Sequence, residues 1–164
     1  LDQYFSLGSS EKFRERVVAL DVWTGTSPSW EYGLDGAITN RPPVFEGAYL
    51  GGVWKMRGYP FARFSDKAGI YYGAEYRMTP HWNPFTKWTG VQKLVGVEWI
   101  QIVPFAELGR VAPTWDLATL HSSMKWDVGV GVRAKAKGLI VRIDVAGSRE
   151  GLGVQMMVDH PFQF

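Results

Sequence analysis

The sequence predicts an all-β protein, and within that class an antiparallel transmembrane β-barrel. Three observations carry this prediction. Apolar and polar residues alternate with a period of two in several segments, whereas helical periodicity is nowhere convincing. Glycine and aromatic residues are abundant, with 19 Gly, 8 Trp, 7 Tyr and 9 Phe in 164 residues. The polar faces of the expected strands mix charged residues with glycine, which is typical of a wet barrel interior.

The alternation predicts about eight strands. Weaker alternation indicates the first three and the fifth, and sharp alternation indicates the others; turn signals such as Asn40–Pro43 and Lys137-Gly138 separate them. In chain order the expected strands cover Gln3–Leu7, Phe13–Trp23, Val44–Leu50, Ala68–Met78, Leu94–Leu108, Met124–Lys135, Leu139–Ala146 and Val154–Phe164. Pro104 lacks a backbone donor, so we expect a bulge or a broken pairing there.

The orientation of the faces decides between a membrane barrel and a soluble sheet. In the strand around Asp127, Val128, Val130 and Val132 share one face, while charged residues and glycine share the other. A membrane barrel turns the apolar face to lipid, and a soluble sheet turns it to a core. The last strand ends with Phe162 and Phe164 on its apolar face, as a C-terminal signal of membrane barrels does. A soluble sandwich or lipocalin-like barrel remains the alternative.

Composition and charge exclude several classes. The length suits one domain, residues 1–164. A net charge of +2 argues against nucleic acid as a partner. The longest run free of charged residues is nine residues, too short for a transmembrane helix. The chain has no cysteine, and its three histidines (His81, His121 and His160) lack metal-ligand spacing, so we expect no metal, no cofactor and no enzymatic activity.

Several motifs occur in a fixed order over about 115 residues. They are Gly51-Gly52-Val53-Trp54-Lys55-Met56-Arg57-Gly58-Tyr59, Ala74-Glu75-Tyr76-Arg77, Phe105-Ala106-Glu107-Leu108-Gly109, Gly129-Val130-Gly131-Val132-Arg133, Arg142-Ile143-Asp144 and His160-Pro161-Phe162. The set resembles the last third of the BamA/TamA-like (bacterial surface antigen) family of outer-membrane assembly and secretion barrels. Two positions depart from the family pattern, because Glu107 stands where Asp is usual and Met56 where Val or Leu is usual.

The resemblance implies that a loop of about residues 51–61 enters the barrel lumen from the extracellular side. Arg57 would then fork onto Glu107, with Asp127 nearby. The residues expected to hold this loop are Met56, Arg57, Gly58, Tyr59, Phe105, Glu107, Gly109 and Asp127. The residues expected on the inner faces of the strands are Glu75, Arg77, Gly129, Gly131, Arg133, Arg142 and Asp144. The connections Thr24–Pro43 and Thr79–Lys93 would lie on the periplasmic side.

An eight-stranded barrel is only just wide enough for its own side chains, so it would not also hold an inserted loop. We therefore expect the chain to be the C-terminal half of a barrel of roughly 16 strands. Its partners would be the N-terminal half, from the same protein or another chain, or a second copy. A complete eight-stranded barrel is the alternative.

The resemblance also implies a location in the bacterial outer membrane, with outer-membrane lipid and unfolded polypeptide as partners. The expected function is the insertion or translocation of unfolded polypeptides. Two alternatives stay open, namely a passive membrane anchor or pore domain of a longer protein, and a soluble lipid-binding β-barrel.

Overall fold

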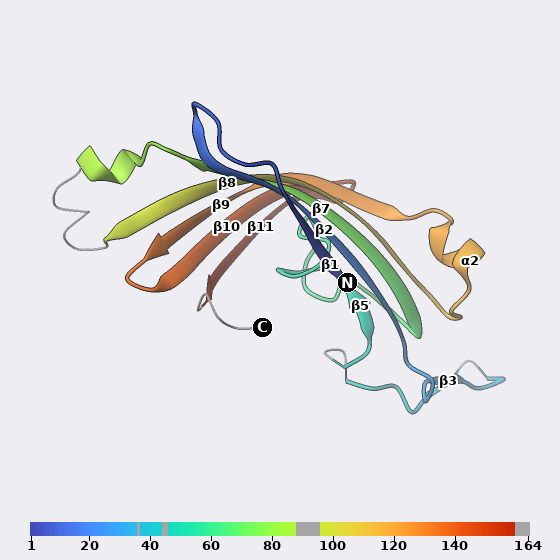
Figure 1. The fold of residues 1–164 in the computed structure, drawn as a ribbon. Helices are drawn as coiled ribbons and strands as arrows, with labels where there is room; N and C mark the ends of the chain where they lie inside the picture. The colour runs from blue at the N-terminus through green and yellow to red at the C-terminus, as the bar shows by residue number, and fades with distance from the viewer. Residues whose placement is uncertain (36, 44–45, 88–95, 160–164) are drawn as a thin grey trace.

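The computed structural model describes residues 1–35, 37–43, 46–87 and 96–159. The chain is mostly β-strand (60%) with nearly no helix. Seven antiparallel strands form one large sheet in the order β1-β2-β7-β8-β9-β10-β11 (Figure 1). Their bounds are β1 Asp2–Ser6, β2 Phe13–Thr26, β7 Ala68–Pro80, β8 Val97–Ala112, β9 Lys125–Ala136, β10 Leu139–Ser148 and β11 Gly151–Asp159.

The remaining elements are short and lie in the connections. β3 (Glu31–Tyr32) pairs with β4 (Ile38–Thr39), and β5 (Ala48–Leu50) pairs with β6 (Phe64–Asp66). A 3-10 helix, η1 (Pro84–Lys87), follows β7, and a short helix, α2 (Leu117–His121), follows β8. Within the described part of the chain, no helix has the length and apolar character needed to cross a membrane.

The prediction that Val44–Leu50 is a strand of the large sheet is wrong. Residues 44–45 lie outside the described part, Glu46 and Gly47 turn back to hydrogen-bond the carbonyl of Pro43, and only Ala48–Leu50 is extended. Directly after Leu50 the chain bends at Gly51 and Gly52, both with φ of +110°. β2 therefore pairs directly with β7, with Asp21 opposite Gly73.

This change in strand order also corrects the placement of one connection. The β2–β7, β8–β9 and β10–β11 connections leave the sheet at one end, and the β1–β2, β7–β8 and β9–β10 connections leave it at the other. Residues 24–43 therefore lie at the same end as residues 51–61, not at the opposite end as expected. The long connection after β7 does lie at the opposite end.

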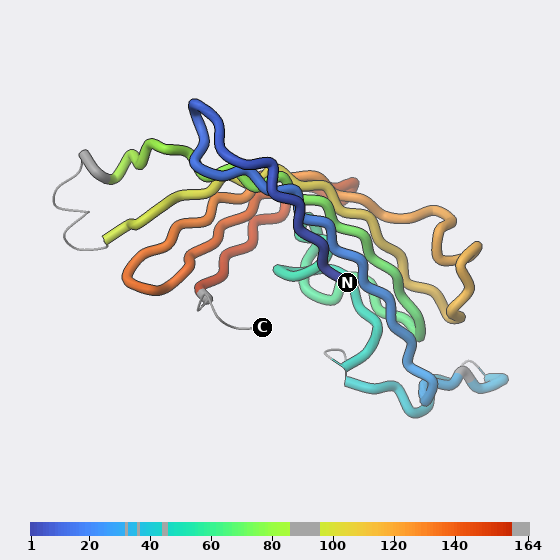
Figure 2. Tube along the Cα trace, in the orientation of Figure 1, coloured from blue at the N-terminus to red at the C-terminus, as the bar shows by residue number. Residues whose placement is uncertain are grey.

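The sheet is strongly curved, as Figure 2 shows, and its two faces differ in polarity. On the convex face Val130 and Met156 are 46% and 72% exposed. On the concave face Glu107 and Asp127, directly opposite each other on β8 and β9, are 1% and 0% exposed. The apolar face is thus the exposed one, and the charged face is the covered one.

Residues 51–61, which we call the inserted loop, lie beneath the concave face and cover part of it (Figure 1). The loop is closed at its base by backbone hydrogen bonds from Gly51 to Lys55 (3.0 Å) and from Gly52 to Tyr59 (3.0 Å). Its apolar residues pack with the sheet in a buried cluster of Leu50, Met56, Tyr59 and Tyr71. A side chain on Gly51 would collide with the carbonyl of Pro60, so this turn requires glycine.

Two further expectations concern single positions. Strands β7 and β8 pair at Glu75–Phe105 and at Met78–Ile102. The pairing is interrupted between these two positions, beside Pro104. The break expected at this proline is therefore present. Phe162 and Phe164, the expected C-terminal signal, lie outside the described residues.

The sheet is not closed in the described part of the chain, and β1 and β11 are its edges. All six pairings within it are antiparallel. Because the number of strands is odd, the two edge strands run in the same direction.

Candidate functional site

The candidate site is the contact between the tip of the inserted loop and the concave face. Met56 adopts φ of +57°, and the amide of Tyr59 donates to the carbonyl of Met56 (3.0 Å), which makes a tight turn. This turn directs Arg57 and Gly58 at the strands. A long unbranched side chain tolerates a positive φ better than a β-branched one, so methionine suits this position.

Arg57 is buried, with 2% of its surface exposed, and it contacts three carboxylates. Its Nε lies 3.0 Å from Oε1 of Glu107, and its Nη1 lies 2.9 Å from Glu75 and 3.3 Å from Asp144. The expected contact with Glu107 is present, but the expected two-pronged fork is not. The guanidinium instead spreads over β7, β8 and β10 and joins three strands.

The backbone of the loop tip is bound by the strands as well as its side chains. The amide of Arg57 donates to Oε2 of Glu107 (2.6 Å), and the amide of Gly58 donates to Oδ2 of Asp127 (3.1 Å). Asp127 therefore holds the loop through Gly58 rather than through Arg57. A Cβ on Gly58 would lie 2.7 Å from the Cβ of Asp127, so only glycine can approach β9 this closely.

The other three inner-face arginines pair with two of these carboxylates, those of Glu75 and Asp144. Arg77 and Arg133 bind Glu75 at 2.7 and 2.8 Å, and Arg142 binds Asp144. Arg142 also donates to the carbonyl of Val53 in the loop (3.1 Å). Four arginines thus share the concave face with four carboxylates, those of Glu75, Glu107, Asp127 and Asp144. Burial of Glu75, Glu107 and Asp144 is tolerated because each is paired with an arginine, whereas Asp127 is stabilised by the Gly58 amide.

Glycines on β8 and β9 make room for the side chains that meet the loop. A Cβ on Gly129 would collide with the ring of Phe105, and one on Gly131 would collide with the carboxylate of Asp144. The Phe105 ring in turn lies 3.4 Å below the guanidinium carbon of Arg57, a cation–π contact. A Cβ on Gly109 would lie 2.7 Å from Leu50, under the base of the loop.

The electrostatic setting keeps Arg57 charged. Burial by itself works against the charged form, but the carboxylates of Glu107, Glu75 and Asp144 outweigh it and raise the pKa of Arg57 above its ordinary value. On the β2 side, burial lowers the pKa of Lys55, and Asp21 partly opposes this. The Lys55 ammonium lies 3.9 Å from the centre of the Trp23 ring, which fastens this side of the loop to β2.

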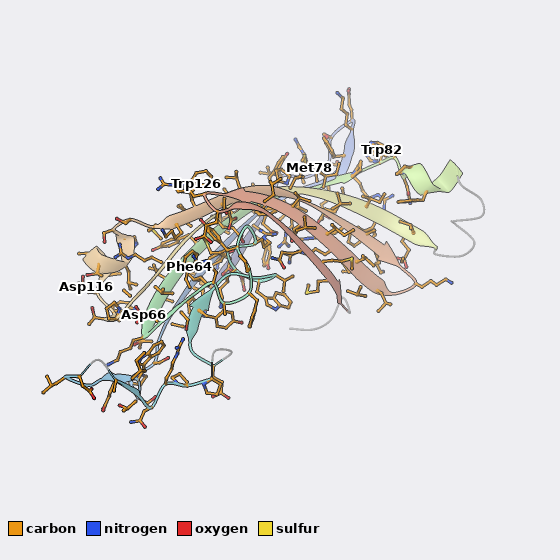
Figure 3. The ribbon with its side chains drawn as sticks, turned by 180° about the vertical axis from the view of Figure 1, so that it is seen from behind. Phe64, Asp66, Met78, Trp82, Asp116 and Trp126 are labelled. Carbon is orange, nitrogen blue, oxygen red and sulfur yellow. The ribbon has the colours of Figure 1, made fainter. Side chains whose placement is uncertain are left out.

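Large side chains near the site lie on both faces of the sheet. Figure 3 shows Met78 and Trp126 on the convex side and Phe64 beneath the sheet. The Phe64 ring lies 5.0 Å from that of Tyr59, and the Tyr59 hydroxyl donates to the carbonyl of Trp126 (3.1 Å). Tyr59 is therefore held by both a ring contact and a hydrogen bond.

Three residues of the site were missed by the sequence reasoning. The Tyr71 hydroxyl donates to Glu107 (2.6 Å), and the Gln155 amide donates to the carbonyls of Arg57 (3.4 Å) and Tyr59 (3.5 Å). Gly153 lies against the loop backbone. Tyr71 shares the inner face with Glu75 by strand parity, a signal that could have identified it. The same parity places Gly153 and Gln155 on the inner face, but no feature of the sequence indicates that the loop reaches β11.

All the residues expected to hold the loop therefore lie on or around it, and the inner-face residues lie on the concave face. The charges are used in holding the loop to the strands. Within the described residues no three His, Asp or Glu side chains are grouped so that they could share a metal ion. Comparisons with known protein families, curated proteins and solved structures found no match.

Proposed function

We propose that this chain is the C-terminal half of an outer-membrane β-barrel that inserts or translocates unfolded polypeptides. It would lie in the bacterial outer membrane, with the convex face toward lipid and the concave face toward an aqueous lumen. The inserted loop would enter that lumen from the extracellular side.

The distribution of polarity over the two faces supports the membrane part of this proposal. Leu108, Val130 and Val154 are exposed on the convex face, while the charged residues are buried on the concave face. A soluble sheet of this size would leave a large apolar surface in water, which is costly and prone to aggregation. Lipid removes that cost, because the lipid-facing residues of outer-membrane barrels are apolar and the lumen-facing residues are polar.

The docked loop is the single observation that carries the transport part. A loop that bears Arg57-Gly58-Tyr59 and meets a carboxylate of a Phe-x-Glu-x-Gly strand is the feature on which the resemblance to the BamA/TamA-like family depends. Here Arg57 contacts Glu107 at 3.0 Å within the concave face. A passive anchor has no need for a loop that crosses from β2 to β11 through its interior.

The odd number of strands indicates that a different segment, rather than a second copy of this chain, would complete the barrel. Two copies related by rotation about the barrel axis would place β1 beside a β11 that runs the same way. Both seams would then be parallel, whereas outer-membrane barrels are antiparallel throughout. A segment with an odd number of strands, from the N-terminal side or another chain, closes the barrel with antiparallel seams.

Space beside the loop supports a conducting lumen. A cavity of about 610 Å³ opens between the loop and the β1–β2 side of the sheet, lined among others by Tyr4, Asp21, Trp54 and Arg77. The loop therefore covers part of the concave face and leaves a wet region beside it, rather than plugging the half-barrel completely.

The test is a transport or insertion assay on the full protein reconstituted in lipid vesicles. We expect Arg57→Ala to abolish most activity while the protein still integrates into the bilayer. Full activity of Arg57→Ala would overturn the role of the docked loop in transport, and no activity of the unaltered protein would overturn the transport proposal and leave the anchor or pore role. A stable monomer in buffer without detergent would overturn the membrane proposal and leave the soluble lipid-binding barrel.

A further inference from the structure

We propose that Gly153 and Gln155 are positioning residues that fasten the inserted loop to the edge strand β11, so that the loop and the edge respond to each other. The inference deepens the proposed function, and its use in transport rests on that function. The coupling itself is a property of contacts within this chain and can be measured separately.

Gly153 brings the two backbones into direct contact. A Cβ built on Gly153 would lie 2.7 Å from the carbonyl oxygen of Arg57 and 3.1 Å from two backbone atoms of Gly58. These atoms are backbone, so they cannot swing aside as the tip of a flexible side chain can. Glycine is therefore required on β11 for the loop to reach its position on Glu107 and Asp127.

Gln155 supplies the polar half of the same contact. It lies two residues further along β11 on the same concave face, and its amide points at the carbonyls of Arg57 and Tyr59 (3.4 and 3.5 Å). The loop tip thus has its amides bound by carboxylates of β8 and β9 and its carbonyls bound by β11. Both sides of the turn are held, by different strands.

The position of β11 gives this contact its importance. β11 pairs with β10 along one side only, so in the described part of the chain its other side has no strand partner. Around the contact a cavity of about 330 Å³ lies between Gly58–Pro60 of the loop and Glu150–Gln155. The loop therefore holds β11 at a few points rather than along a continuous surface, and Gly153 and Gln155 are two of them.

A second link between the connection and this corner is the ion pair Arg63–Glu150 (2.7 Å). Its side chains are 49% and 38% exposed, so solvent screens the pair and its contribution is small. The partly buried contact at Gly153 and Gln155 is therefore the one expected to transmit a change.

Coupling between two sites is reciprocal. If loop docking restrains β11, then loss of docking must loosen β11, and a change in β11 must loosen the loop by the same factor. The amides of Arg57 and Gly58 report docking directly, because each donates to a strand carboxylate only when the loop is docked.

The experiment is hydrogen exchange on the full protein in its native membrane or detergent. Gly153→Ala should speed exchange at the amides of Arg57 and Gly58 by about 5- to 10-fold, and Arg57→Ala should speed exchange in residues 151–158 by a similar factor. Gln155→Met, which removes only the amide, should have a smaller effect in the same direction. The matched control is Gly147→Ala, where a Cβ meets nothing closer than 3.8 Å.

Equal behaviour of Gly153→Ala and Gly147→Ala would overturn the inference, as would Arg57→Ala loosening β9 as much as β11. These outcomes are independent of transport. If Arg57→Ala loses activity but hydrogen exchange in β11 does not change, the proposed function stands and the coupling is wrong. Coupling without any transport would leave the coupling and remove the function.

Discussion

The inserted loop and residues 27–43 belong to the same connection between β2 and β7, but they are packed very differently. In residues 27–43, Leu34 and Ile38 are exposed, and Arg41 lies on the surface with a hydrogen bond to Ser65 (3.2 Å) and a contact with the Trp30 ring. In the inserted loop, Arg57 is buried among three carboxylates. The inserted loop is fixed by complementary charge and by apolar contacts with the strands, whereas in residues 27–43 the large buried side chain is that of Trp30.

The largest expected difference is between the two arginines. Arg57→Ala leaves Glu107, Glu75 and Asp144 without a shared cation, and breaking a buried pair costs about 3–5 kcal/mol. Water beside the loop reduces this, so we expect about 2–4 kcal/mol in urea unfolding and rapid tryptic cleavage at Lys55. Arg41→Ala, the matched control, should cost less than about 1 kcal/mol and leave Lys55 protected. Equal costs at the two arginines would contradict the comparison.

A double variant that swaps the charges of Arg57 and Glu107 tests how many partners Arg57 has. If Glu107 were its only partner, Arg57→Glu combined with Glu107→Arg would restore much of the lost stability. The contacts with Glu75 and Asp144 predict that it does not, because the new carboxylate would face both. Recovery of more than half of the loss, measured in the same unfolding assay, would show that Glu107 dominates.

Glycines in the two regions should also differ. Gly58→Ala places a methyl group against the Cβ of Asp127 and 3.2 Å from that of Ser148, and overpacking of this kind costs about 1–3 kcal/mol. Gly33→Ala has its close contact with the exposed carboxylate tip of Asp35, which can rotate at the cost of one exposed hydrogen bond from the Ala37 amide, and it lies 3.5 Å from the Ala37 carbonyl, an ordinary contact distance. We expect a loss of tryptic protection at Lys55 for the first variant and no measurable change for the second.

A pair of substitutions at Met56 tests the turn itself. Met56→Ile puts a β-branched residue at φ of +57°, which we expect to cost about 1–2 kcal/mol more than Met56→Leu. Ile and Leu have the same number of carbon atoms to pack against Leu50 and Tyr71, so the difference between the two variants reports backbone strain. Thermal unfolding of the two proteins side by side is the measurement, and equal midpoints would argue against the strain.

The smallest effect is expected at Asp127. Its Oδ2 accepts the Gly58 amide, while its Oδ1 has no hydrogen-bond partner among the described residues and stands opposite Glu107. Asp127→Asn keeps an acceptor for Gly58 and adds a donor that can face Glu107. We expect a change between zero and about 1 kcal/mol of added stability in urea unfolding. A clear loss would mean that the negative charge of Asp127 itself holds the loop.

The sequence predicted the faces of the sheet better than its strand order. Alternation with a period of two assigned Glu75, Glu107 and Asp127 to one face, and these side chains do share the concave face. It failed at Val44–Leu50, because a short extended segment between turns cannot be told from the end of a strand by periodicity alone.

The site could be predicted only in part, for a physical reason. The contact of Arg57 with Glu107 was expected from a resemblance to a known family and not from periodicity. The contacts of Gly153 and Gln155 arise where a loop crosses the face of a distant strand. Neither the alternation of residues nor the spacing of motifs indicates which strands of the sheet a loop will contact.

The partners of the inserted loop also impose an order on folding. Glu107, Asp127 and Asp144 follow the loop tip by 50, 69 and 87 residues, and Gln155 follows Arg57 by 98. The chain must therefore bring β8, β9, β10 and β11 together before the loop has a complete binding surface, and closing such long loops is slow. Docking of Arg57 is thus expected among the last steps of folding, and a protected Lys55 would mark a molecule in which the sheet is already built.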